Sequence, residues 1–322
     1  MIARMSAKKT PPKKTKAKTK APAPVHEDRP LVGMSAAICA FFMMSVMNVF
    51  AKILSESHHV IEIAFYRNLI ATLPFLIWIF VFGRTDILKI NANPVGIGVR
   101  SVIGTISLAT TFAAFASMPM ADTTAFLFTA SLFIPILGVI FLNEKVGPYR
   151  WGAVLVGFIG VLVMLRPTGD VNTTGVTLAL SAAFMHATLQ TILRALGKTE
   201  KPETVTFYFV TIGTIVSALA LPFVAKPPTL HEIPLLFAVG LSGALAQFLL
   251  SIAFKYAQAA VVTVFNYSGI IWATLFGWMI WNDWPTHTIL IGGAIVISSN
   301  IFILYRESRK RKITDATIQA KL

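Results

Sequence analysis

The sequence contains little charge, few acidic residues and almost no cysteine. Only 13% of its 322 residues are Asp, Glu, Lys or Arg, whereas a soluble domain usually carries about 25%. The single cysteine, Cys39, excludes an intramolecular disulfide and a cysteine-rich metal centre. Hydrophobic residues make up 55% of the chain, which indicates that most of its surface faces something other than water.

Missing motifs exclude several classes of function. The chain has no GxxxxGK[ST] phosphate-binding loop, and GIGVRS at 96–101 lacks the third glycine of a dinucleotide fingerprint. It also lacks HExxH, GxSxG and dense carboxylate clusters, and we interpret His58–His59 as an inert surface pair. We therefore expect no enzymatic activity, no catalytic residue, no metal site and no cofactor. An integral-membrane enzyme or a receptor without transport stays open as the alternative.

What the chain has in abundance is long apolar runs. Most of these runs approach the ~20 residues that cross a ~30 Å hydrocarbon core. Because a bilayer offers the backbone no hydrogen-bond partners, each run should be a helix. The sequence predicts an all-α polytopic membrane protein whose ten transmembrane helices occupy residues 31–54, 60–82, 95–118, 121–142, 149–165, 174–196, 204–224, 233–256, 259–281 and 286–305.

Basic residues predict the orientation of these helices. Of the 28 Lys and Arg residues, nine lie in residues 1–29 and six in 306–322. With ten spans both tails share a side, and the connections on that side carry more Lys and Arg than those opposite. The positive-inside bias therefore places both termini in the cytoplasm, for a protein of the inner membrane. We interpret residues 1–29 as a disordered arm rather than a nucleic-acid binder, because no aromatic residue interleaves its lysines.

The chain repeats itself. A shift of 142 residues aligns GMSAAICAFFMM (33–44) with GVTLALSAAFMH (175–186) and places Arg67 on Phe209. A shift of 139 aligns the third to fifth helices with the eighth to tenth. Since each repeat holds five helices, an odd number, the second repeat should be inverted, as in many secondary transporters. The predicted units are a basic tail, two repeats and a second basic tail, at residues 1–29, 30–167, 168–306 and 307–322.

Particular motifs resemble a known family. The segment TASLFIPILGVIFLNEKVGPYRWGAVLVGFIGVLVMLRP (129–167) resembles helices four and five of the EamA family in the drug/metabolite transporter superfamily. Phe65-Tyr66-Arg67 is similar to the family's aromatic–arginine start of helix two. The resemblance covers roughly residues 31–306 and implies a secondary, non-ATP transporter of a small organic metabolite that works by alternating access. Residues 51–68 resemble the S-adenosylmethionine-uptake-like branch, and riboflavin-uptake members are also similar.

Arg67 is the first candidate for contact with a substrate. A charge at bilayer depth costs about 2.5–3.5 kcal/mol, and Arg67 should lie about 9 Å inside the outer end of its helix. The guanidinium could snorkel to the headgroups or pair with Asp122, which begins the fourth helix on the same side. Alternatively, it could grip a carboxylate or phosphate bidentately.

Other polar residues inside the spans complete the candidate site. Asn48 and Gln190 match under the repeat, as do Tyr66 and Tyr208, and these pairs could serve helix packing, an interfacial belt or substrate contact. His186 could carry a coupling proton or form an interhelical hydrogen bond. The full set of substrate-binding candidates is Asn48, Tyr66, Arg67, His186, Gln190, Tyr208, Gln247, Asn266, Tyr267 and Trp272.

Three acidic residues at helix ends have expected roles in structure or gating, namely Asp122, Glu144 and Asp283. The predicted partners are a small-molecule metabolite and the lipid bilayer, and no nucleic acid. Proton coupling or exchange with a counter-substrate, uptake or efflux, and monomer or homodimer are alternatives that the residues leave open.

Overall fold

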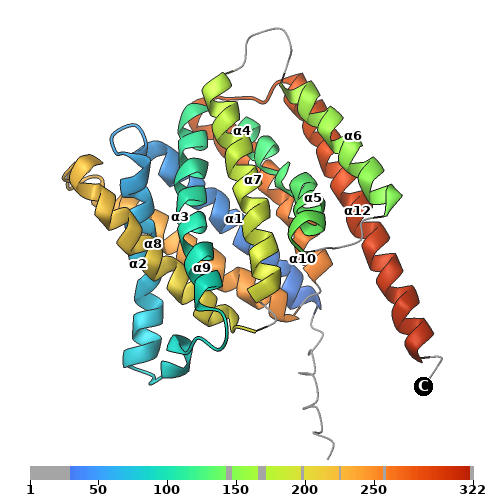
Figure 1. The fold of residues 1–322 in the computed structure, drawn as a ribbon. Helices are drawn as coiled ribbons and strands as arrows, with labels where there is room; N and C mark the ends of the chain where they lie inside the picture. The colour runs from blue at the N-terminus through green and yellow to red at the C-terminus, as the bar shows by residue number, and fades with distance from the viewer. Residues whose placement is uncertain are drawn as a thin grey trace, which may run out of the picture.

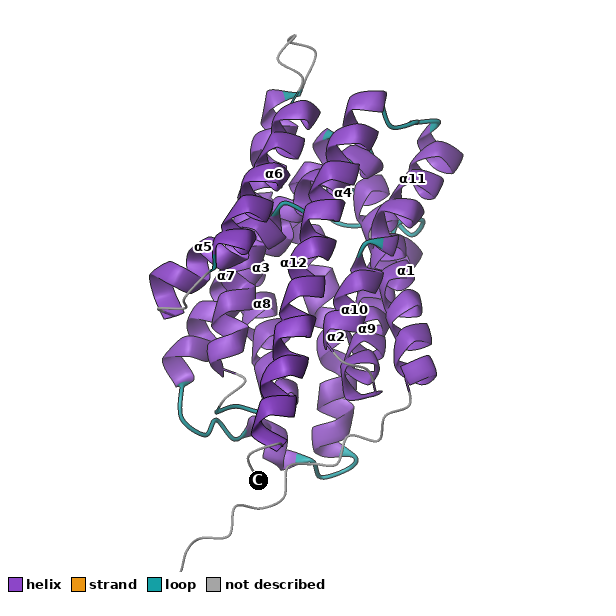
Figure 2. Cartoon of the chain, turned by 90° about the vertical axis from the view of Figure 1, so that its right-hand side faces the viewer, coloured by secondary structure: helices purple, strands orange, loops and turns teal. Residues whose placement is uncertain are grey.

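The computed structural model describes residues 30–142, 147–165, 172–196, 199–224, 226–256 and 259–319, and within them every regular element is a helix (Figures 1 and 2). The helices in chain order are α1 (Pro30–Leu54), α2 (Val60–Phe80), the 3-10 helix η1 (Thr85–Leu88), α3 (Pro94–Ser117), α4 (Met120–Leu127), α5 (Ala130–Leu142), α6 (Pro148–Met164), α7 (Thr173–Leu196), α8 (Pro202–Val224), α9 (Ile233–Tyr256), α10 (Ala259–Asn266), α11 (Ser268–Trp281) and α12 (His287–Gln319). The tail at 1–29 lies outside the described residues, whereas the backbone of 307–319 continues α12.

Seven helical stretches in the described part of the chain are long and apolar enough to cross a membrane. They are Leu31–Leu54, Val60–Phe80, Pro94–Ser117, Met120–Phe141, Thr173–Leu193, Pro202–Val224 and Ile233–Leu250. Two shorter apolar helices cover Trp151–Met164 and His287–Ile303. Large apolar side chains such as Phe80 and Phe223 point outward, exposed by 81% and 87%. The chain is therefore a multi-pass membrane protein.

Two of the runs expected to be single helices are broken in the middle. The run at 121–142 forms α4 and α5, and the run at 259–281 forms α10 and α11. At the first break the hydroxyl of Thr129 donates to the carbonyl of Phe126 (2.7 Å), and that of Ser131 to the carbonyl of Phe128 (2.6 Å). Side chains thus satisfy carbonyls that a broken helix frees, and a hydropathy pattern does not detect such a break.

Helices from the two halves of the chain pack across one another. Helix α1 packs on α9, and the pair that corresponds to it under the repeat, α7 and α3, is also in contact. Helix α2 packs on its own counterpart α8, and α6 on its counterpart α12. The start of α1 and the end of α12 lie at the same end of the bundle (Figures 1 and 2).

The α6–α12 crossing depends on glycine. A Cβ added at Gly160 would lie 2.7 Å from the carbonyl oxygen of Gly292, and a Cβ at Gly292 would lie 2.5 Å from that of Gly160. Nearby, the hydroxyl of Ser299 donates to the carbonyl of Ala153. Under the 139-residue shift, Gly160 corresponds to Ser299 and Ala153 corresponds to Gly292. The Gly160–Gly292 contact and the Ser299–Ala153 contact are therefore equivalent. Small residues thus let the two backbones approach, as is common between membrane helices.

We expect Gly160→Leu to destabilise the protein, because a side chain there must push α6 away from backbone atoms of α12. Overpacking of this kind costs about 1–3 kcal/mol and should lower the midpoint of thermal unfolding of the detergent-purified protein. Gly152→Leu is the matched control, since a Cβ at Gly152 meets nothing within 4 Å on the same helix. Equal midpoints for the two variants would contradict the packing argument.

Candidate functional site

Arg67 is buried between helices and has no acidic partner among the residues that the structure describes. Its side chain extends from α2 and only 3% of the residue is exposed, so it does not snorkel to the surface. One guanidinium nitrogen, Nη1, donates to Oδ1 of Asn68 at 2.8 Å, and Nε has no partner. The guanidinium carbon lies 5.7 Å from the ring centre of Phe209, the residue that corresponds to Arg67 in the second repeat.

A second arginine lies on the same aromatic ring. The guanidinium carbon of Arg100, from α3, is 4.0 Å from the ring centre of Phe209, which is within the range of a cation–π contact. Neither arginine forms an ion pair with a described residue. The sequence did not indicate this role, because Arg100 lies near the start of a predicted helix, where a basic residue fits the positive-inside bias without any further role.

The unsatisfied polar atoms in this cluster are all hydrogen-bond donors. They are Nε of Arg67, Nδ2 of Asn68, and Nε and Nη1 of Arg100. The carbonyl oxygen of the Asn68 side chain already accepts from Arg67. A buried donor left without an acceptor is costly, and two of these side chains are cations. The cluster can therefore accommodate an anionic group with several acceptor oxygens.

Three glycines make room for this donor cluster of Arg67, Asn68 and Arg100. A Cβ at Gly104 of α3 would lie 3.3 Å from Nη1 of Arg100 and 2.7 Å from the ring of Phe209. On α8, a Cβ at Gly213 would lie 2.6 Å from Nδ2 of Asn68. A Cβ at Gly243 of α9 would lie 3.1 Å from Nε of Arg67. Because these three positions are glycines, no side chain at them covers the donors.

The matched pairs from the repeat do not all join this cluster. The hydroxyl of Tyr208 donates to the carbonyl of Leu88 at 3.0 Å, which fastens α8 to the η1 segment. Tyr66 packs edge-on against Phe65, with ring centres 5.2 Å apart, and Gln190 is exposed. Nε2 of His186 lies 3.3 Å from the hydroxyl of Thr111 on α3, as an interhelical hydrogen bond requires.

A second group of candidates lies on α1 and on the broken helix α10–α11. Oδ1 of Asn48 and Nε1 of Trp272 are buried without a hydrogen-bond partner. Trp272 meets Phe42 edge-on with ring centres 5.0 Å apart, and Tyr267 meets Phe128 in the same way at 5.2 Å. The two remaining candidates are partly buried in neighbouring helices, namely Gln247 and Asn266.

Two of the three acidic residues with expected gating roles, Asp122 and Asp283, are close enough to Lys52 for their charges to favour its charged form. The ammonium of Lys52 donates to the carbonyl of Met118 at 2.7 Å and lies 4.9 Å from the ring centre of Trp281. Arg67 donates to Asn68 and forms no ion pair with an acidic residue in the described part of the chain, so the structure shows no pairing of Arg67 with Asp122. Glu144 lies outside the described residues.

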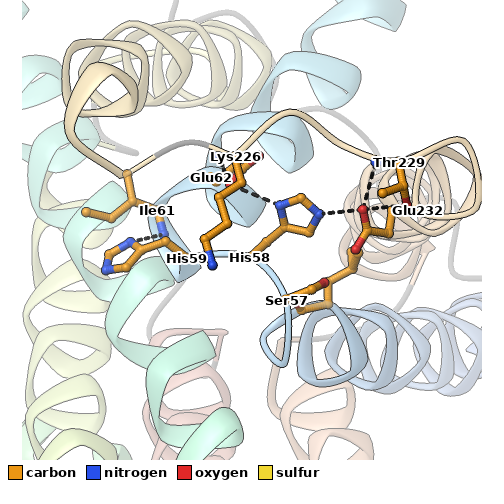
Figure 3. Close-up of polar contacts among 9 residues, drawn as sticks. Ser57, His58, His59, Ile61, Glu62, Lys226, Thr229 and Glu232 are labelled. Carbon is orange, nitrogen blue, oxygen red and sulfur yellow. Dashed lines mark hydrogen bonds and ion pairs between the residues drawn. The ribbon is translucent and has the colours of Figure 1, made fainter.

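The interpretation of His58 as an inert surface residue is wrong. His58 is buried, and its ring lies between two carboxylates (Figure 3): Nδ1 is 3.0 Å from Glu62 of α2 and Nε2 is 3.1 Å from Glu232 before α9. Burial alone would lower the pKa of His58, but the nearby carboxylates of Glu62 and Glu232 outweigh burial and raise it. His59 is exposed, and its ring accepts from the backbone N–H of Ile61.

Comparisons with known proteins agree with this architecture. The chain is 28% identical over 278 residues to the S-adenosylmethionine uptake transporter of Rickettsia bellii, covering 86% of this chain and 95% of that protein. It is 30% identical to the pseudopaline exporter CntI of Pseudomonas aeruginosa, over 82% of this chain and 93% of that protein. It is 29% identical to the riboflavin transporter of Rhizobium johnstonii, over 66% and 71%.

The fold and the family both follow from these matches. A solved structure with 15% identity aligns with a TM-score of 0.58 over 87% of this chain and 97% of that chain, so the two share a fold. Residues 31–166 and 173–305 each match the EamA-like transporter family. The resemblance predicted from the sequence is thus confirmed, and the chain belongs to the EamA-like transporter family.

Proposed function

We propose that this transporter is a secondary carrier that moves a small organic metabolite by alternating access between two inverted five-helix repeats. In this proposal it is not an enzyme, it crosses the inner membrane ten times, and both termini are cytoplasmic. The two broken helices, α4–α5 and α10–α11, are the fourth crossing of each repeat. The two separate family matches, at 31–166 and 173–305, support the division of the chain.

Contacts between corresponding residues support the twofold relation of the repeats. Residues related by a twofold axis can touch each other only close to that axis. Arg67 lies over the ring of Phe209, its counterpart under the 142-residue shift. Phe128 and Tyr267, counterparts under the 139-residue shift, meet edge-on at the two helix breaks. The axis proposed here passes near both contacts, and a site next to it can face either side in turn.

The observation that carries the substrate class is the pair of arginines without an acidic partner. Uncompensated cations inside a membrane protein are expensive, and Arg67 and Arg100 share one aromatic ring. We infer that an anionic group of the substrate, a carboxylate or a phosphate, supplies the missing acceptors. S-adenosylmethionine, named for some relatives, carries such a carboxylate, whereas riboflavin, named for others, carries neither group.

The other candidates take secondary places in this proposal. Asn48, Trp272, Tyr267 and Asn266 would line the side of the site that α1 and the broken helix α10–α11 form. The positions of Tyr66, Tyr208, His186 and Gln247 favour roles in packing between helices, whereas the exposed Gln190 has no role in substrate contact. Asp122 and Asp283, with Lys52, would stabilise one end of the bundle.

We expect Arg67→Ala to weaken binding of anionic ligands without preventing membrane insertion. Loss of a hydrogen bond to a charged group costs about 1.5–3 kcal/mol, or about tenfold to hundredfold in affinity. Thermal-shift titration of the purified protein measures this effect, because a ligand stabilises the state that it binds. Arg100→Ala should act in the same direction, and Arg84→Ala is the control, since Arg84 is exposed and paired with Asp86.

Two matched pairs of probes distinguish the anionic groups. Riboflavin 5′-phosphate differs from riboflavin by a phosphate, and S-adenosylmethionine differs from 5′-methylthioadenosine by its amino-acid portion and by the positive charge on its sulfur. The charged member of at least one pair should stabilise the wild type more than its partner does, and this difference should shrink in Arg67→Ala. Uptake of the stabilising compound into proteoliposomes, without chemical change, would establish transport. Equal shifts for wild type and Arg67→Ala with every charged probe would exclude Arg67 as the anchor.

The proposed orientation has its own test. A fluorescent protein fused at either terminus should be fluorescent, and alkaline phosphatase fused at either terminus should be inactive, because both ends are cytoplasmic. A phosphatase fused after Leu230, in the connection before α9, should be active. Termini on opposite faces of the membrane would rule out an even number of crossings and with it the ten-helix arrangement.

A further inference from the structure

His58 has a counterpart at the opposite end of the bundle. The 142-residue shift places His58 on Glu200, and each residue follows the first helix of its repeat. His58 contacts Glu232, in the connection between α8 and α9. Glu200 accepts from the backbone N–H groups of Asn91 (2.9 Å), Ala92 (2.8 Å) and Asn93 (2.8 Å), in the connection between α2 and α3.

The two contacts therefore occupy corresponding positions in the two repeats, at opposite ends of the bundle. We call the contact of His58 with Glu62 and Glu232 the His58 latch, and the contact of Glu200 with the backbone of residues 91–93 the Glu200 latch. Each one fastens a turn of one repeat to the connection between the second and third helices of the other repeat. The end of α7, which Glu200 follows, lies at the end of the bundle that holds the start of α1 and the end of α12, whereas the end of α1, which His58 follows, lies at the other end (Figure 1). Alternating access requires that contacts of this kind separate at one end at a time.

The Glu200 latch does not depend on pH near neutrality. Its acceptor is a carboxylate and its donors are backbone N–H groups, which do not titrate. The hydrogen bonds from Asn91, Ala92 and Asn93 lower the pKa of Glu200, so the carboxylate stays ionised. Beside it, Lys201 pairs with Asp86 at 3.0 Å. A change of pH across the range in which a histidine titrates therefore does not alter the charge of this contact.

The His58 latch, in contrast, requires a proton. Each ring nitrogen of His58 lies within ion-pair distance of a carboxylate oxygen, Nδ1 at 3.0 Å from Glu62 and Nε2 at 3.1 Å from Glu232. A neutral imidazole has one N–H and one lone pair, so it can donate to Glu62 or to Glu232 but not to both. After deprotonation a lone pair would face a carboxylate. The complete bridge of Figure 3 therefore exists only with the imidazolium.

The two carboxylates beside His58 also accept hydrogen bonds from other groups. The carboxylate of Glu232 is held by the backbone N–H and hydroxyl of Thr229 (2.8 and 2.7 Å), and these bonds, with His58 and Ser57, lower the pKa of Glu232 to about 2. Glu62 also accepts from the backbone N–H of Lys226 at 3.3 Å. A cavity of about 380 Å³ adjoins the latch, and its charged and titratable lining residues are Glu56, His58, His59 and Lys226.

We propose that His58 is a proton-binding site that fastens this end of the transporter when protonated and lets it open when it loses the proton. The proposal rests on alternating access as the transport mechanism. Under it, the pH on one side of the membrane controls opening at that side, whereas the Glu200 end responds to the substrate alone. The raised pKa of His58 means that the stabilisation is present at acidic pH and is lost as pH rises through that value.

Distances between spin labels measure opening directly. On a Cys39→Ser background, labels at Glu56→Cys and Leu230→Cys report on the His58 end, and both positions are exposed. Labels at the exposed positions Lys89→Cys and Glu203→Cys report on the Glu200 end. Purified protein in lipid nanodiscs is compared at about pH 5.5 and about pH 8.5, on either side of the usual histidine range.

For the wild type we expect one short distance at the His58 end at the acidic pH and an additional longer one at the alkaline pH. His58→Gln, which cannot become charged, should show the longer distance at both pH values. His58→Lys, which stays charged, should show only the short one. His59→Gln is the matched control and should respond like the wild type. The Glu200 end should not widen with pH in any of these proteins.

The outcomes separate the latch from the transport mechanism. If His58→Gln keeps the wild-type response to pH, or if the wild type does not respond at all, the latch proposal is wrong. In either case the proteoliposome assay still reports whether the wild type transports. If the His58 end opens with pH as expected but no probe is carried, the latch stands and the proposed function fails.

Discussion

Close approach of helices from the two halves of the chain is the interaction on which this structure depends. Glycines on α3, α8 and α9 bring these helices within reach of Arg67, Asn68 and Arg100. A different glycine pair, Gly160 and Gly292, lets the backbones of α6 and α12 approach each other. Because water is absent from the hydrocarbon layer, packing of this kind must replace the hydrophobic effect as the source of association. The donor cluster exists only where both halves contribute helices.

The sequence was sufficient for the helical membrane fold and the family, because hydropathy and motif spacing are properties of the chain itself, and it singled out Arg67 as an unpaired charge whose role stays a prediction. It did not predict Arg100, since the approach of two arginines across one ring depends on lateral packing that helix spacing does not reveal. His58 was misjudged for a related reason. Short connections were assumed to be exposed, although the correspondence of His58 with Glu200 was already present in the 142-residue register.

Charge is distributed unevenly over an architecture whose helix contacts are nearly symmetric. The helices of one half pack as their counterparts do in the other, but the chemistry at corresponding positions differs. An arginine corresponds to a phenylalanine near the proposed axis, and a histidine corresponds to a glutamate at the two latches. These differences give the two sides of the membrane unequal properties. A carrier needs such an inequality if its two openings are to respond to different signals.

The contact between Arg67 and Phe209 has a consequence for how such a protein can be built. In an assembly of two identical five-helix chains, a residue near the axis would face its own copy. An arginine there would meet a second guanidinium, and a phenylalanine would leave that position uncharged. Joining two unlike halves in one polypeptide allows a single positive charge to rest against a ring. A single unmatched charge near the axis is thus possible in a chain that joins both halves, but not in a symmetric dimer.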